Sequence, residues 1–146
     1  MSEVFVYGTL QRGGKWAHTI PNAQFIGPDT ILGELYLDEY RGAPILFHGE
    51  DVIPGEVFDI PKMDLGPVDV MEREFGYNAE QIQTGSGREV LVYVHSDDTL
   101  KERFERIPNF DAAAEFRRWY ERASQEPESS TWQYFTTHGG RSPESR

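Results

Sequence analysis

Short apolar runs punctuated by glycine and proline fill the first half of the chain, and this pattern limits the fold more than any other feature. Residues 4–7 (Val-Phe-Val-Tyr) end at Gly8, which predicts a buried strand that enters a tight turn. The Gly-Pro-Asp tripeptide at residues 27–29 predicts a break between two strands. The expected strands after the first one are residues 23–26, 31–37 and 55–60, the last with period-two alternation. We therefore expect the first half to be mostly β-sheet.

The middle of the chain predicts a helix and then a hairpin. Asp64 and the proline that follows suit the first turn of a short helix ending near residue 74. Strands at residues 79–84 and 88–95 flank a Gly-Ser-Gly turn, which is typical of a hairpin with a bulge. In the second strand, Leu91, Tyr93 and His95 are expected on one face and Val90, Val92 and Val94 on the other.

The last third is expected to be helical. Thr99 and Glu102 fit a capping box, and the apolar spacing that follows predicts a helix to Ile107, stopped by proline. Asp111 is expected to cap a longer helix that ends near Ala123. Residues 132–135 are interpreted as a last strand or a packing arm.

A length of 146 residues predicts one domain. We assign it to residues 1–136, with a core at residues 3–95 and a helical part at residues 98–136. The remaining residues, 137–146, are expected to form a disordered tail.

Composition excludes several classes of function. The chain has no cysteine, which rules out a disulfide framework, a thiolate zinc site and a cysteine nucleophile. The four histidines lie far apart in the sequence, so we expect no metal site and no cofactor. A net charge of −11 opposes binding to nucleic acid or to an anionic membrane. With no targeting segment or apolar span, the sequence is expected to be cytoplasmic.

Two segments are candidates for chemistry. Residues 7–10 (Tyr-Gly-Thr-Leu) would present successive backbone N–H groups after a strand, an arrangement that binds carboxylates or oxyanions. Taken alone, this segment is more often an ordinary turn. Glu72 lies beside Met71 and Phe75, and partial burial there would raise its pKa toward the range useful for proton transfer. Taken alone, it is more often a solvated glutamate at a helix end.

Together the two segments resemble the gamma-glutamylcyclotransferase-like family. Its members share an N-terminal Tyr-Gly-Ser/Thr-Leu turn and a Leu-Asp-x-x-Glu segment followed closely by Tyr, which correspond here to residues 7–10, 68–72 and Tyr77. Residues 33–36 and 52–60 continue the resemblance, which covers about residues 3–95. Two departures stand out. Val68 replaces the usual Leu, and Arg73-Glu74 follows Glu72 where the family more often has Gly, so a shifted alignment would make Glu74 the matching acid.

The resemblance implies an α+β fold, a small mixed and mostly antiparallel β-barrel with surrounding helices. It implies a reaction in which the α-amine of a γ-glutamyl amine or peptide attacks its own γ-carbonyl and releases 5-oxoproline and a free amine. Such a cyclisation needs no cofactor, because proximity supplies much of the acceleration. Glu72 would be the general acid and base, with Glu74 as the alternative. The residues expected to bind or line the substrate site are Tyr7, Gly8, Thr9, Leu10, Tyr77 and Tyr93, with Trp16 as a further candidate.

A second hypothesis belongs to another class. The chain would keep the fold and the anion pocket as a non-catalytic module that binds 5-oxoproline or a glutamate-like anion. Arg73-Glu74 in place of the expected Gly motivates it, since the turn would then not present Glu72 inward. The expected partner under either hypothesis is a small molecule, and the sequence does not identify the leaving amine or the oligomeric state.

Overall fold

The computed structural model describes residues 2–144, in which six strands form one curled sheet. The sheet order is β4-β5-β1-β3-β2-β6, and all neighbours are antiparallel except β1 and β5, which are parallel. The strands are β1 (Ser2–Val6), β2 (Gln24–Asp38), β3 (Ala43–Ile60), β4 (Tyr77–Gln83), β5 (Glu89–His95) and β6 (Glu105–Ile107). The helices are α1 (Lys62–Glu74), α2 (Ala112–Ala123) and α3 (Ser130–Thr137), with 3-10 turns at Ala17–Thr19 and Asp98–Glu102. The expected α+β class with a mixed, mostly antiparallel, barrel-like sheet is confirmed.

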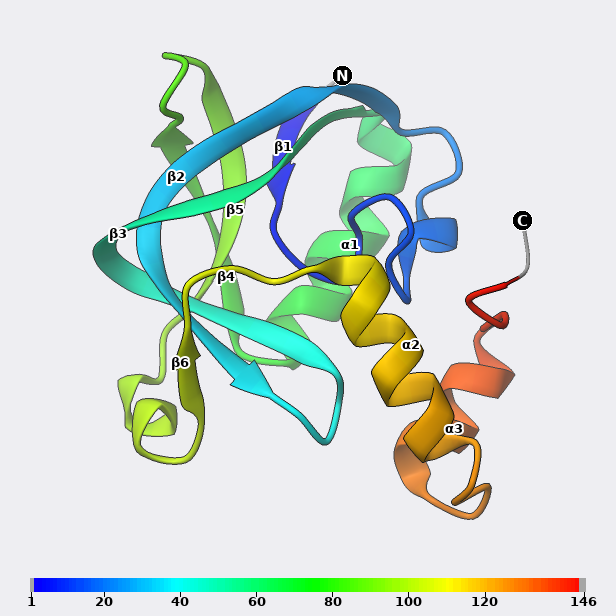
Figure 1. The fold of residues 1–146 in the computed structure, drawn as a ribbon. Helices are drawn as coiled ribbons and strands as arrows, with labels where there is room; N and C mark the ends of the chain where they lie inside the picture. Colours follow the sequence, from blue (N-terminus) through cyan, green and yellow to red (C-terminus); the bar gives the residue numbers. More distant parts are fainter. Residues whose placement is uncertain (1, 145–146) are drawn as a thin grey trace.

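A long hairpin of β2 and β3 forms the curved backbone of the sheet (Figure 1). The predicted break at residues 27–29 is wrong, because β2 runs through it with a bulge between Phe25 and Gly27. Pro28 lies where β2 has only β3 as a neighbour, because β6 pairs with β2 only at Leu35, Tyr36 and Leu37, and such an edge position tolerates proline. Strand β3 begins at Ala43, twelve residues earlier than the sequence predicts, since prolines and glycines interrupt its pattern.

Side chains alternate between the two faces of the sheet and pack into two hydrophobic cores. On β5, Val90, Val92 and Val94 enter the first core, and Leu91 and Tyr93 contact the second, as the alternation predicts. Helix α1 covers the second core through Val68, which is buried among Val4, Val6, Phe58 and Ile60 of the strands. The helix therefore packs on the face of the sheet to which β1 and β3 contribute these residues.

Two expectations for the last third differ from the structure: the helix up to Ile107 is wrong, and of the two interpretations of residues 132–135 the strand is wrong. The helix expected up to Ile107 is a single 3-10 turn followed by β6, because residues 105–107 complete the free edge of β2. Residues 132–135 belong to α3, whose cap is Ser129, with its side chain accepting a hydrogen bond from the Trp132 amide. Asp111 caps α2 as predicted and accepts a hydrogen bond from the Ala114 amide at 3.1 Å.

The end of the chain is partly described. Thr137 is the last residue of α3, the Gly140 amide donates a hydrogen bond to the Phe135 carbonyl at 2.9 Å, and Glu144 lies 3.7 Å from Arg117. Residues 145–146 of the tail expected to be disordered lie outside the described residues. The division at residue 136 stays a prediction. Among the helices described, none is long and apolar enough to cross a membrane.

Gly76 ends α1 in a conformation that fits glycine best. Its φ is +90°, and a Cβ added there would lie 2.7 Å from Nε2 of His95. That histidine is held in place, since its Nε2 donates to the Phe75 carbonyl at 3.0 Å while its Nδ1 accepts from the Asp97 amide at 3.1 Å. The junction between α1 and β4 thus leaves no room for a side chain.

We predict that Gly76→Ala lowers the free energy of unfolding by about 2 kcal/mol, because it combines backbone strain with a clash against a fixed ring. Urea denaturation would measure the loss. Gly27→Ala is the matched control, since a Cβ there meets nothing within 4 Å. Equal stability of the two variants would contradict the prediction.

Candidate active site

Glu72 lies on the face of α1 that packs against the sheet. Leu65, Val68 and Glu72 recur at i, i+3 and i+7, and the first two contact the second core. The helix face that buries Val68 therefore also carries the carboxyl of Glu72 inward. Burial raises the pKa of Glu72 from 4.5 to about 7. Glu74, two residues on, is exposed.

Three tyrosines surround this carboxyl. Tyr7 follows β1, Tyr77 begins β4 and Tyr93 lies on β5, so the three come from separate parts of the sheet. Burial raises the pKa of each tyrosine, and the negative charge of Glu72 raises all three further. They therefore stay protonated and act as hydrogen-bond donors.

The hydroxyls of the tyrosines are held in position. Tyr7 donates to the Tyr93 carbonyl at 2.7 Å, and Tyr77 donates to the Pro44 carbonyl at 3.3 Å. Tyr93 donates to Asp69 at 3.3 Å, and Asp69 is also paired with Arg73 at 2.9 Å. Asp69 thus orients a tyrosine, and Glu72 is the carboxyl whose pKa lies near neutrality. All three tyrosines that the sequence names as site candidates lie close enough to Glu72 for its charge to raise their pKa values, and their role stays a prediction.

The Tyr7–Leu10 turn leaves its amides available. The Gln11 amide donates to the Gly8 carbonyl at 3.1 Å, and the Trp16 amide donates to the Thr9 carbonyl at 2.9 Å. Within residues 2–144, no group accepts a hydrogen bond from the amides of Gly8, Thr9 or Leu10. Gly8 is required sterically, since a Cβ there would lie 2.8 Å from the Pro44 side chain. The turn can therefore offer N–H groups to an anion.

Other residues differ from the sequence-based predictions. Trp16 packs edge-on against Phe135 of α3, with ring centroids 5.5 Å apart, rather than beside Glu72. Sequence reasoning missed Arg41, whose guanidinium lies 5.3 Å from the Phe75 ring and whose charge lowers the pKa of Tyr77. It also assigned no role to Lys15, although the structure buries this side chain. Neither residue stands in a pattern that marks it.

The residues described include no cluster of three or more histidines and carboxylates that could hold a metal ion. The site instead combines one acid of near-neutral pKa, three neutral phenols and a turn with free amides. Such a set can transfer a proton and bind an anion at neighbouring positions.

The fold and these residues define a small α+β protein that has one carboxyl of near-neutral pKa close to Tyr7, at the start of a turn with free amides. Residues 4–111 match the family described as gamma-glutamyl cyclotransferase, AIG2-like, and the chain belongs to this family. It is 35% identical over 102 residues to the gamma-glutamylcyclotransferase family protein YtfP of Escherichia coli K12, an alignment that covers 67% of this chain and 88% of YtfP.

Solved structures share the fold. The crystal structure of PH0828 from Pyrococcus horikoshii superposes with a TM-score of 0.64 at 22% identity, covering 89% of this chain and 99% of that one. An AIG2-like protein from mouse gives a TM-score of 0.67 at 20% identity, covering 76% of this chain and 88% of that one. At these identities the similarity establishes the fold.

The pKa of Glu72 predicts how stability depends on pH. Its pKa is about 7 when folded and near 4.5 when unfolded, so the folded state holds the proton more tightly. The free energy that this group contributes to folding is therefore fully present below pH 4.5 and is lost as the pH rises through 7. We predict that the free energy of unfolding of Glu72→Gln, taken relative to that of the wild type, rises by about 2 kcal/mol from pH 4.5 to pH 8.

Urea denaturation of both proteins at the two pH values measures this change. Glu74→Gln serves as the control, and its stability relative to the wild type should stay nearly constant. A difference between Glu72→Gln and the wild type that does not change with pH would show that Glu72 is not buried as described.

Proposed function

We propose that this protein is a cyclotransferase that releases 5-oxoproline and a free amine from a γ-glutamyl amine or peptide, with Glu72 as general acid and base. The observation that carries the proposal is the position of one carboxyl, its pKa raised to about 7, among three neutral tyrosines next to the Tyr7–Leu10 turn. Membership of the family supports the reaction class.

The chemistry needs a group that takes a proton and returns it. Glu72 as carboxylate accepts a proton from the α-ammonium of the substrate, and the freed amine attacks the γ-carbonyl carbon. A new C–N bond closes the five-membered ring. Glu72 then donates the proton to the departing nitrogen as the original C–N bond breaks. The ring nitrogen gives its second proton back to Glu72, which leaves the lactam N–H of 5-oxoproline, and the freed amine or solvent then takes that proton from Glu72. A pKa of about 7 keeps both protonation states populated at neutral pH, which suits both steps.

The other residues hold the substrate. The free amides of the turn would bind its α-carboxylate, as the main-chain N–H groups of such turns do for anions. Tyr77 and Tyr93 would border the reacting end, with their hydroxyl oxygens held in place by the hydrogen bonds to the Pro44 carbonyl and to Asp69. Because the attack is intramolecular, holding the chain of the substrate in a bent conformation supplies much of the rate.

The direct test incubates the protein with γ-glutamyl amines and γ-glutamyl amino acids and measures 5-oxoproline and free amine by mass spectrometry. The matched control substrate is the corresponding glutaryl amide, which has the same amide bond but no α-amine. We expect 5-oxoproline from the γ-glutamyl compounds and no reaction of the glutaryl amide. Release of glutamate, or cleavage of the glutaryl amide, would show a hydrolase instead.

The same experiment, with calorimetry added, tests the second hypothesis, a non-catalytic binding module. A non-catalytic module would bind 5-oxoproline in calorimetry and turn over none of the γ-glutamyl compounds. The inward position of Glu72 favours the enzyme, because Arg73-Glu74 does not turn the Glu72 carboxyl away from the three tyrosines.

A further inference from the structure

Helices α2 and α3 contribute none of the site residues and lie beyond residues 4–111, which match the family. They form a separate apolar group, which we call the C-terminal cluster. Its buried members are Phe116, Trp119, Ala123 and Phe135, with Trp16, Tyr120 and Trp132 packed against them. Trp16 is the one member from outside the two helices, and it follows the Tyr7–Leu10 turn by six residues. The cluster therefore packs on the loop that carries the anion-binding turn.

Lys15 joins the loop to this cluster. The side chain is buried, at 6% exposure, and its Nζ lies 3.4 Å from the centroid of the Trp119 ring. The same Nζ donates a hydrogen bond to the Arg41 carbonyl at 2.9 Å. An ammonium over an indole face is a favourable contact, and the hydrogen bond restrains its direction. Lys15 thus connects α2, the loop and the turn between β2 and β3.

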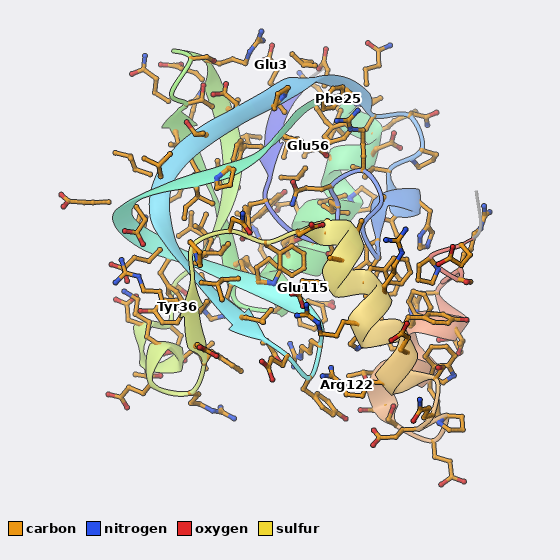
Figure 2. All side chains as sticks on the ribbon, viewed as in Figure 1. Glu3, Phe25, Tyr36, Glu56, Glu115 and Arg122 are labelled. Atoms are coloured by element: carbon orange, nitrogen blue, oxygen red, sulfur yellow. The ribbon has the colours of Figure 1, made fainter. Side chains whose placement is uncertain are left out.

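Helix α2 is itself anchored to that turn. Trp119 donates from its indole N–H to the Tyr40 carbonyl at 3.2 Å, and Arg122 donates to the Glu39 carbonyl. A Cβ on Gly42 would lie 2.8 Å from Trp119, so the backbone of the turn touches the ring. Figure 2 shows Glu115 and Arg122 on the side of α2 that faces the turn. The helix is a fixed support for Lys15.

The loop is also held at its opposite end. The Arg12 backbone amide and guanidinium both donate to Glu56, at 2.8 and 2.9 Å, and the guanidinium lies 3.5 Å from the Phe25 ring centroid. Figure 2 marks Phe25 and Glu56 on the strands, away from α2. The part of the loop that remains, residues 13–16, depends on the C-terminal cluster.

Residues 14–16 contact the peptide group that joins Thr9 to Leu10 and restrain it. The Trp16 amide donates to the Thr9 carbonyl at 2.9 Å, and a Cβ on Gly14 would lie 2.5 Å from that same oxygen. The Thr9 carbonyl and the Leu10 N–H belong to one planar peptide unit, in which they point in opposite directions. A hydrogen bond that fixes the carbonyl therefore also directs the Leu10 N–H.

We propose that Lys15 is a positioning residue, through which α2 and α3 hold the Thr9–Leu10 peptide so that the Leu10 N–H points at the bound anion. This role rests on the proposed function of the turn. Through Lys15, the C-terminal helices would have a role in substrate binding.

The cost of burying Lys15 indicates that this residue positions the loop and does not stabilise the fold. Burial lowers the pKa of Lys15 to about 7; Asp38 opposes this effect, and Arg41 and Arg122 add to it. Burying this ammonium therefore costs stability at neutral pH. Methionine keeps most of the apolar stem and removes the charge. We expect Lys15→Met to be at least as stable as the wild type while holding the loop less firmly.

The test compares the wild type, Lys15→Met and Lys101→Met. Lys101 is the matched control, because its ammonium also lies over an aromatic ring, Phe47 at 5.2 Å, and it pairs with Glu34 away from the loop. Thermal unfolding, amide hydrogen exchange of residues 11–16, the dissociation constant for 5-oxoproline, and kcat and KM for a γ-glutamyl amine are measured on each.

For Lys15→Met we expect faster exchange at the Trp16 amide, which donates to the Thr9 carbonyl, and about a tenfold rise in KM and in the dissociation constant, the loss of roughly one well-placed hydrogen bond. We expect kcat within about threefold and an unchanged or higher melting temperature, since the contact is made before and during the reaction. Lys101→Met should match the wild type in all these values except melting temperature.

Unchanged exchange and KM in Lys15→Met would overturn the inference. A fall in melting temperature with a matching loss in kcat would also overturn it, by showing a purely stabilising role. If the wild type neither turns over nor binds any of the compounds, the proposed function fails. The exchange rate of the Trp16 amide then still shows whether Lys15 holds the loop.

Discussion

Glu72→Gln is expected to lower kcat for 5-oxoproline release by about a thousandfold, with KM changed less than about threefold. Glutamine has the same shape and fits among Tyr7, Tyr77 and Tyr93, but its amide neither accepts the proton of the α-ammonium nor returns one to the leaving nitrogen at neutral pH. General acid–base groups contribute rate factors of about this size. Steady-state kinetics with a γ-glutamyl amine, followed by mass spectrometry of 5-oxoproline, measures the loss.

Glu74→Gln is the matched control, since Glu74 is exposed at the end of α1. We expect its kcat to stay within about twofold of the wild type, because it makes no contact that the reaction needs. If Glu74→Gln loses activity and Glu72→Gln keeps it, the roles are reversed. If both variants keep full activity, neither glutamate is the acid and base.

Trp119→Ala is expected to lower the free energy of unfolding by about 4 kcal/mol, the usual cost of removing a large buried aromatic side chain. The ring is 1% exposed and lies 5.0 Å from the Phe135 ring and 3.4 Å from Nζ of Lys15. Its loss leaves a cavity, an unpaired Tyr40 carbonyl and a buried ammonium without its aromatic partner. Urea denaturation followed by far-ultraviolet circular dichroism measures the change.

Trp132→Ala is the comparison, because Trp132 packs on the same cluster but is only half-buried. A loss of about half that of Trp119→Ala is expected from the smaller apolar area removed. If the two variants are equally stable, or if Trp119→Ala costs less than about 1 kcal/mol, then α2 is not packed on the turn between β2 and β3 as the structure shows.

Local patterns predicted those elements whose determinants are close in sequence. The hairpin of β4 and β5 and the Asp111 cap of α2 depend on a few neighbouring residues, and both are confirmed. The helix expected to end at Ile107 failed because an edge of β2, some seventy residues earlier, pairs with residues 105–107 instead. The strand break predicted at Pro28 was wrong for a similar reason, since only the sheet order shows that β2 is an edge strand there.

By itself, the sequence determined the residue types available for chemistry: a turn with two small residues after an apolar strand, one helix with a pair of glutamates near its end, and tyrosines nearby. Only the tertiary structure decided which glutamate is buried, that the tyrosines surround it and that Lys15 lies under α2. The physical reason is desolvation. A carboxyl or an ammonium acquires an unusual pKa from the groups that exclude water around it, and packing brings those groups from distant parts of the chain.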